Sequence, residues 1–375
     1  MAEALLFLVA AVPAAAQAPS ASPSPLARGR DAFEVNLGLQ ASYDDNALRT
    51  VPAGGGQYIG DATAALGYRH QWKRSWLSLA GQAGAQRYSR IDGLNRIDYG
   101  GRGTLALTLF RRTKLTFNQA YTSSYTRDIP ELAASGLGLP LVVANRIEST
   151  LRFERPLMTG WQFEADAKYE RLDFPSRLLA QGEEVSLFPT LNHRLGRHHW
   201  LTFGYAFEQG RSQGLDERAH GVLAGVRRSP PKGLGYLFLA GDAYLEGSHR
   251  NVPIGTAELS VTRRKSALTA RYDRRIRHAF GLDRQVVSDL VSLSLSRAVS
   301  RRLTVAANAT LGVSDDPRDP AFRYRSDTYR GLVQWAVSRT VSAGAGFEHW
   351  RSTLGGGFVA PSNRGWLSLG CRLGS

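Results

Sequence analysis

Histidine is the side chain most often used for proton transfer, and the candidates in this chain are His193, His198, His199 and His349. An acyl-transfer site needs a nucleophile beside such a base, and a third group that orients the base. The chain has no G-x-S-x-G motif, and no histidine pair has metal-ligand spacing with cysteine or carboxylate residues nearby. We therefore expect a protein that is not an enzyme, with no catalytic residues, no metal and no cofactor. A hydrolase that uses His193 or His199 is kept as an alternative.

Two short motifs offer ligand-binding groups. Gly355-Gly356-Gly357 would cradle a phosphate only if a helix followed it, and no helix is expected there. Tyr43-Asp44-Asp45-Asn46 presents oxygens suited to calcium, but aspartate and asparagine also end strands in tight turns. The turn is the simpler interpretation of this second motif.

Charged side chains alternate with apolar ones, most clearly in Trp161–Glu170 (WQFEADAKYE). Aromatic and alanine side chains take one parity, and the polar parity holds Gln162, Glu164, Asp166, Lys168 and Glu170. This alternation predicts a β-strand with one apolar and one polar face. A strand that crosses a bilayer beside an aqueous lumen has this pattern, as does a half-buried strand of a soluble sandwich.

The rest of the chain favours the membrane interpretation. Alternating segments repeat from Asp31 to the end, and we count about eighteen of them (16–18). The connections alternate between short ones such as Gln71–Ser75 and Arg264–Lys265, and long ones such as Arg127–Asn145, Gln209–Arg218 and Ile276–Val286. Short periplasmic turns and long extracellular loops are typical of bacterial outer-membrane barrels. We therefore predict an all-β fold, a transmembrane antiparallel up-and-down β-barrel, with both termini in the periplasm.

The first residues have a different composition, which predicts export. Leu5–Ala16 is an apolar core of signal-peptide length, and Ala16-Gln17-Ala18 fits a cleavage site. We therefore expect a signal peptide over residues 1–18, a flexible periplasmic linker over 19–30 and the barrel over 31–375. The only cysteine is Cys371, so no intrachain disulfide and no lipoprotein anchor are expected.

The chain is strongly basic, with a net charge of +15 and a pI near 10.3. Its basic residues are scattered or form short clusters at the expected turns, so we expect no nucleic-acid partner. The clusters Arg111-Arg112, Arg227-Arg228, Arg263-Arg264-Lys265 and Arg301-Arg302 could dock a periplasmic partner. Simple solvation of the barrel end is the other interpretation.

A bare barrel of this size is expected to enclose an aqueous channel. The polar parity of the strands predicts a set of lumen-lining charges, Arg102, Arg152, Glu164, Asp166, Lys168, Arg194, Arg271, Arg330, Glu348 and Arg372. Arg227, Glu148, Glu154, Asp242 and Glu258 are also expected to point inward. Such charges set ionic preference, or they merely solvate the lumen and pair across strands.

Aromatic residues of inward parity could stack on sugar rings, namely Phe188, Phe238, Tyr244 and Trp350. Loop packing or a misassigned parity is the alternative for each. The longest expected loop, Arg127–Asn145, is apolar for an exposed segment and could fold into the lumen as a constriction or lid.

At Tyr43-Asp44-Asp45-Asn46, followed by Arg49-Thr50, the sequence resembles the outer-membrane β-barrels of exopolysaccharide and capsule secretion loci, the "beta-barrel porin 2" type. Strand texture such as Gly67-Tyr68-Arg69-His70 extends the resemblance over the mature chain, but the chain ends in Ser375 where such barrels commonly end in an aromatic residue. The resemblance implies a terminal conduit that carries a secreted exopolysaccharide out of the cell. Its partners would be outer-membrane lipids, the translocated polysaccharide and periplasmic polysaccharide-export proteins. The alternatives are a porin for passive diffusion of small solutes, which could be anionic, and an adhesion scaffold with a closed lumen.

Overall fold

The computed structural model describes residues 31–47, 55–110, 112–126, 142–176, 179–212, 214–230, 232–280, 284–354 and 358–374. The predicted signal peptide and linker, and most of Arg127–Asn145, lie outside these residues. The described strands are β1 (Asp31–Asp44), β2 (Gln57–Gln71), β3 (Ser75–Tyr88), β4 (Arg96–Leu109), β5 (Thr113–Tyr125), β6 (Val143–Met158), β7 (Trp161–Asp173), β8 (Gly182–Arg194), β9 (His199–Ser212), β10 (Leu215–Arg228), β11 (Gly233–Leu245), β12 (Arg250–Arg263), β13 (Ser266–Ala279), β14 (Arg284–Ala298), β15 (Leu303–Asp316), β16 (Asp319–Ala336), β17 (Val341–Leu354) and β18 (Phe358–Gly374). One 3-10 helix, Asp92–Leu94, precedes β4.

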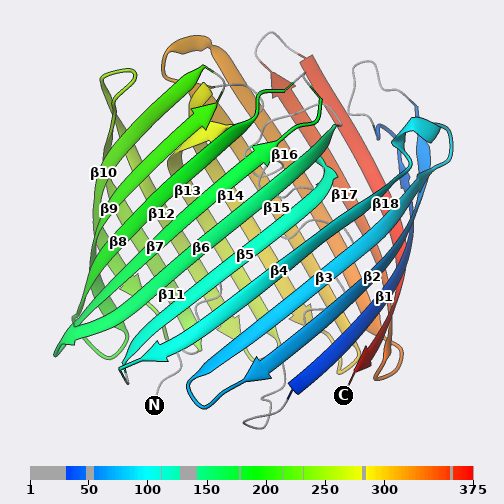
Figure 1. Cartoon of the computed structure of the whole chain (residues 1–375), viewed down its shortest axis with the longest axis horizontal. Helices are drawn as coiled ribbons and strands as arrows, with labels where there is room; N and C mark the ends of the chain where they lie inside the picture. Colours follow the sequence, from blue (N-terminus) through cyan, green and yellow to red (C-terminus); the bar gives the residue numbers. More distant parts are fainter. Residues whose placement is uncertain are drawn as a thin grey trace.

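The strands form a single closed sheet (Figure 1). Each strand pairs antiparallel with its neighbours in the chain, and β18 pairs with β1 from Glu34↔Gly374 to Asp44↔Arg364. Closure removes both sheet edges, so every strand in the wall has two hydrogen-bonded neighbours. The predicted antiparallel up-and-down barrel of 18 strands is confirmed.

The two faces of the wall differ in polarity. On β1, Phe33 is 62% exposed and Leu39 is 61% exposed, whereas the intervening parity carries Gln40, which is only 8% exposed. Residues directly opposite in an antiparallel ladder lie on the same face, so the register carries this assignment from strand to strand. We call the face with Phe33 and Leu39 the outer face, and the other the inner face.

Aromatic pairs mark both ends of the outer face. Near one end, the rings of Tyr43 and Tyr58 lie 5.1 Å apart, and near the other end those of Phe33 and Tyr68 lie 4.9 Å apart. Aromatic girdles that flank an apolar band are expected where a barrel meets the two membrane interfaces. Among the described residues, no helix has the length and apolar character needed to cross a membrane.

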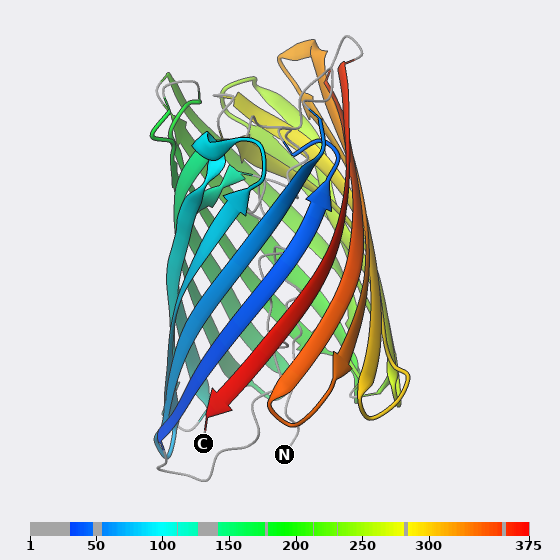
Figure 2. The same cartoon turned by 90° about the vertical axis from the view of Figure 1, so that its right-hand side faces the viewer.

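The two ends of the barrel have different connections (Figure 2). Tight turns join each even strand to the next odd one, at the end where β1 begins and β18 ends, which we call the turn end. Left-handed backbone at Gly160 (φ +82) and Gly233 (φ +96) allows two of these turns. The opposite end is the loop end.

Several long loops predicted for the loop end are wrong. Gln209–Arg218 and Ile276–Val286 were expected to be loops, but strand pairing continues through most of both segments. The alternating pattern fades where strands leave the membrane, because neither face then meets lipid, although the backbone still pairs. The loop end is therefore built largely of β-hairpins.

Candidate functional site

The predicted lumen charges have inner-face ladder positions. Arg152 lies opposite Asp166, Arg271 opposite Glu258, and Arg330 opposite Glu348. The others hold the same parity on their strands, namely Arg102, Glu164, Lys168, Arg194 and Arg372. Their effect on passing solutes stays a prediction.

Ion pairs join β6 to β10 along this inner wall. Arg152 contacts Glu154 at 2.8 Å, Glu164 at 3.3 Å and Asp166 at 3.9 Å. Arg227 of β10 reaches Glu164 at 3.4 Å, across the two intervening strands. Because each charge has partners of opposite sign, this part of the wall presents little net charge.

A second group of paired charges lies nearer the loop end. Glu170 accepts from Lys168 at 2.5 Å and from Arg146 at 2.6 Å, and Arg146 also pairs with Glu148. These contacts fit the interpretation that many inner charges pair across neighbouring strands.

Other inner charges have separate partners. Arg271 lies 3.6 Å from Glu258 and Arg372 lies 2.6 Å from Glu34. Arg330 packs over the Trp366 ring at 5.0 Å. Arg102 is exposed and forms no ion pair with any residue that the structure describes.

Two of the four predicted sugar-stacking residues lie on the outer face and not in the lumen. Phe238 lies opposite Val226 and is 54% exposed, while Tyr244 lies opposite His220 and is 41% exposed, so both are on the outer face. Phe188, opposite Asp166, and Trp350, opposite Thr328, have inner-face positions. The stacking role of these two stays a prediction.

Asp242 is also on the outer face, opposite Val222, and not inside as expected. The cause of these three errors is that β11 is apolar on both parities. Its inner face carries Leu237, Leu239 and Leu245, so alternation alone does not distinguish the faces. This inner face is apolar because another element covers part of it.

That element is a hairpin that folds into the barrel. The β12–β13 ladder ends at Gly255↔Arg274, but β13 and β14 stay paired as far as Ala279↔Arg284. The freed segment crosses to a wall several strands away, where the His278 amide donates to the Glu184 carboxylate at 3.1 Å. We call Arg275–Phe280 with Arg284–Val287 the inward hairpin.

Glycine in the facing wall permits this approach. A Cβ on Gly210 of β9 would lie 2.8 Å from the His278 side chain, closer than real Cβ atoms come. A Cβ on Gly182 of β8 would lie 3.0 Å from His278 and 3.1 Å from Phe280. The two glycines therefore form the surface on which the inward hairpin docks.

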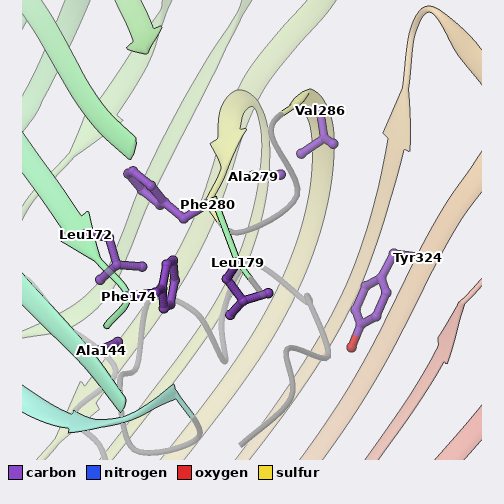
Figure 3. Close-up of a cluster of buried hydrophobic side chains, with 8 residues drawn as sticks. All are labelled: Ala144, Leu172, Phe174, Leu179, Ala279, Phe280, Val286 and Tyr324. Carbon is purple, nitrogen blue, oxygen red and sulfur yellow. The ribbon is translucent and has the colours of Figure 1, made fainter. Parts of the chain in front are cut away.

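The tip of the inward hairpin is held by an apolar cluster (Figure 3). Ala279, Phe280 and Val286 pack with side chains from the β6, β7 and β16 strands and the β7–β8 connection, which are Ala144, Leu172, Phe174, Leu179 and Tyr324. Phe280 is only 7% exposed. Burying a phenylalanine stabilises a docked segment by about 1.5–3 kcal/mol.

The base of the same hairpin packs on the adjoining strands β10–β12. Ile276 and Val287 form a second buried cluster with Ala219, Ala243, Leu245 and Val252 of β10, β11 and β12. The inward hairpin is therefore fixed at both its tip and its base. It is a constriction in the lumen near the loop end.

The hairpin between β15 and β16 also contacts the inward hairpin and the strands next to it. The β15–β16 tip reaches β10 and β12, where Arg318 pairs with Glu217 and Arg250 donates to the Pro317 carbonyl at 2.8 Å. Arg284 of the inward hairpin lies 3.4 Å from both Asp316 and Asp319.

The constriction places charges of opposite sign face to face. Asp273 holds Arg275 at 2.5 Å and Arg277 at 3.4 Å on the hairpin side. The facing wall carries Glu184, whose basic neighbours are Lys168 and Arg277, and Glu208, whose basic neighbours are Arg275 and Arg277. These facing charges create a transverse electric field across the lumen at the inward hairpin.

The Tyr43-Asp44-Asp45-Asn46 motif closes the barrel seam. Asp45 accepts two hydrogen bonds from Asn363, and Asp44 accepts one from Ser362 at 2.8 Å. Asn46 donates to the Pro361 carbonyl at 2.9 Å. These contacts support the interpretation of the motif as a turn.

No other arrangement in the described residues suggests chemistry. In that part of the chain, no group of three or more His, Cys, Asp or Glu side chains could hold a metal ion. His193 stacks near Trp161 with ring centres 4.4 Å apart, and His199 lies 3.3 Å from the Tyr236 hydroxyl. Neither histidine has, among the described residues, both a nucleophile and a third group that orients the ring.

No model of a known protein family matches the chain, and no curated protein matches its sequence. Among solved structures, OccK9 (OpdG) of Pseudomonas aeruginosa is similar with a TM-score of 0.50 at 13% identity, over 92% of this chain and 99% of that chain. OccAB4 of Acinetobacter baumannii gives 0.48 at 11% identity, over 93% and 100%. The siderophore receptor PirA of P. aeruginosa gives 0.47 at 10% identity, over 93% and 81%.

At these identities the similarity concerns the fold. Together with the apolar outer face and the aromatic pairs at its two ends, it defines the protein as an integral outer-membrane β-barrel. The predicted location in the outer membrane is confirmed at this level. The resemblance to barrels of exopolysaccharide loci gains no support from the comparisons.

Proposed function

We propose that the protein is a porin through which small hydrophilic solutes diffuse passively, past a constriction formed by the inward hairpin. The observation that carries this proposal is the docking of that hairpin inside a charged lumen, where its tip packs against β6 and β7 and its base against β10–β12. A fixed constriction admits solutes by size, and the facing charges orient those that carry dipoles.

The ionic preference follows from charges without partners. The β6–β10 wall is neutralised by its own ion pairs, so it selects weakly. Arg102 is exposed on the inner face without a described acidic partner, which favours small anions. The preference is modest because Glu184 and Glu208 oppose it at the constriction.

The exopolysaccharide conduit is the weaker candidate. A polymer would have to pass the inward hairpin, which requires the Phe280 cluster to separate. Loss of surface polysaccharide, with its synthesis intact, on deletion of the gene would favour this candidate over the porin. A translocated polysaccharide and periplasmic export proteins are expected as partners only if the protein is such a conduit.

Planar-bilayer recording tests the porin proposal. The wild-type protein is expected to give a steady conductance, and replacing residues 276–287 by an Asn-Gly turn is expected to raise it by about twofold or more, as in an unobstructed barrel of this size. The matched control replaces Glu246–His249, an exposed connection between β11 and β12, by the same turn. A wild-type channel that stays closed, or equal conductance in both variants, would contradict the proposal.

A further inference from the structure

The turn end of the barrel carries a ring of positive charge that the channel does not use. Every tight turn, or the strand end that enters it, has an exposed lysine or arginine, and these are Lys73, Arg74, Arg112, Arg155, Arg197, Lys232, Arg264, Lys265, Arg301, Arg302 and Arg339. The sequence of these turns contains no aspartate or glutamate. None of these cations forms an ion pair with a residue that the structure describes.

Four arginines beside these turns have outer-face positions. Arg155 lies opposite Phe163, Arg228 opposite Tyr236 and Arg297 opposite Val305. Arg263 shares the parity of Val261, which lies opposite Leu268. We call Arg155, Arg228, Arg263 and Arg297 the outward arginines.

Each outward arginine follows a run of apolar outer-face residues on its own strand, near the turn end. On β14, for example, the outer face runs Val291, Leu293 and Leu295 before it reaches Arg297. A side chain that continues the lipid-facing row so close to the turn end is expected at the headgroup level of the bilayer. Its stem packs on apolar surface while the guanidinium reaches the polar interface.

Exposed apolar residues accompany the cations in the same turns. They are Trp72, Phe110, Leu157, Met158, Leu195, Val299 and Val337, and Phe110 is 91% exposed. Apolar and aromatic residues beside basic ones are typical of segments that insert shallowly into an anionic membrane surface. A merely solvated barrel end would not require the apolar members.

We propose that the outward arginines, with the apolar turn residues, bind headgroup phosphates of anionic phospholipids in the leaflet around the turn end. A guanidinium can hold a phosphate with two parallel hydrogen bonds, which favours arginine at such positions. An acidic soluble protein that approached along the barrel axis would instead meet the turn tips, such as Arg264, Arg301 and Arg339. The outward parity of the four arginines therefore favours lipid over a docked protein.

The experiment measures which lipids the full-length barrel retains. Protein is equilibrated in nanodiscs of phosphatidylcholine with a minor share of phosphatidylglycerol, then transferred to detergent, and bound lipid is counted by native mass spectrometry. The test variant is R155Q/R228Q/R263Q/R297Q, and the matched control is R74Q/R264Q/R301Q/R339Q, which removes the same charge from turn tips. Folding of each variant is checked by its resistance to heat in dodecyl sulfate gels.

The wild type is expected to retain phosphatidylglycerol in preference to phosphatidylcholine. In the test variant, the ratio of bound phosphatidylglycerol to bound phosphatidylcholine is expected to fall about tenfold. The control is expected to lose less than about twofold, and inorganic phosphate is expected not to displace the lipid. No wild-type preference, or an equal loss in the control, would overturn the proposal, and the latter would favour an acidic protein partner. If the test variant does not fold, the wild type is measured at increasing salt concentration. Its preference for phosphatidylglycerol must weaken as salt screens the charges, and a preference that salt leaves unchanged would overturn the proposal.

Discussion

Asp45 and Asn363 join the first loop-end turn of the barrel to its last strand through two hydrogen bonds of 2.6 Å each. One carboxylate oxygen accepts from the Asn363 amide of the backbone, and the other accepts from its side chain. The chain ends come together at this seam, and no covalent link closes it. Arg364 adds contacts to Ser42 at 3.2 Å and to Asp61 at 3.3 Å, so that β18 is tied to β1 and β2.

Asp45→Ala should weaken the seam. Two donors of Asn363 lose a charged acceptor, which costs about 1–3 kcal/mol of the free energy of unfolding. The measurement is the temperature at which the folded band on a dodecyl sulfate gel converts to the unfolded one. Asp315→Ala is the control, because Asp315 is 52% exposed and its one ion pair is 3.6 Å long. Equal melting of the two variants would show that the seam does not depend on Asp45.

Phe280→Ala should loosen the inward hairpin. Replacing a buried phenylalanine by alanine costs about 3–5 kcal/mol, enough to populate an undocked hairpin. Single-channel records should then show added transitions to larger conductance. Phe347→Ala provides the comparison, because Phe347 is an outer-face residue that is 51% exposed. A record identical to the wild type would mean that the apolar cluster does not hold the constriction.

Arg102→Glu should move ion selectivity toward cations. The substitution changes the inner-wall charge by about two units at a residue with no described acidic partner. The reversal potential in a salt gradient measures this shift directly. Arg323→Glu makes the same charge change on an outer-face side chain that is 69% exposed, and it should leave the potential nearly unchanged. A larger effect of the control would place the selectivity outside the lumen.

Phe238→Arg and Leu237→Arg test the corrected faces of β11. Phe238 is on the outer face, where arginine near the bilayer centre costs about 2–4 kcal/mol of stability. Leu237 lies on the inner face between Glu258 and Arg227, so arginine there meets water and an acidic neighbour that offsets the basic one. Folding yield into lipid vesicles should therefore fall for the first variant and be retained for the second. The reverse order would restore the inward assignment of Phe238.

Much of the fold can be predicted from the sequence because it depends on a local property. Period-two alternation in segments such as Trp161–Glu170 sorts side chains between lipid and water, and a strand that spans a bilayer must be paired on both sides. The strand number and most inner-face charges follow from this pattern. The limits appear where β11 is apolar on both parities, so that Phe238, Tyr244 and Asp242 were assigned to the wrong face.

Tertiary structure alone decided what occupies the lumen. Residues 276–286 lack the regular alternation of a membrane strand, so the sequence suggests an exposed loop. The apolar side chains of Ile276, Phe280 and Val286 are the one sign that this segment is buried. Their partners on β7, β10 and β16 lie far away in the sequence, and only closure of the barrel brings those walls within reach of the hairpin. The sequence by itself determined which face of each clearly alternating strand meets lipid, because that choice is made residue by residue. The constriction and the Asp45–Asn363 seam could not be predicted in this way. Both join segments far apart in the sequence, and only the closed barrel brings those segments together.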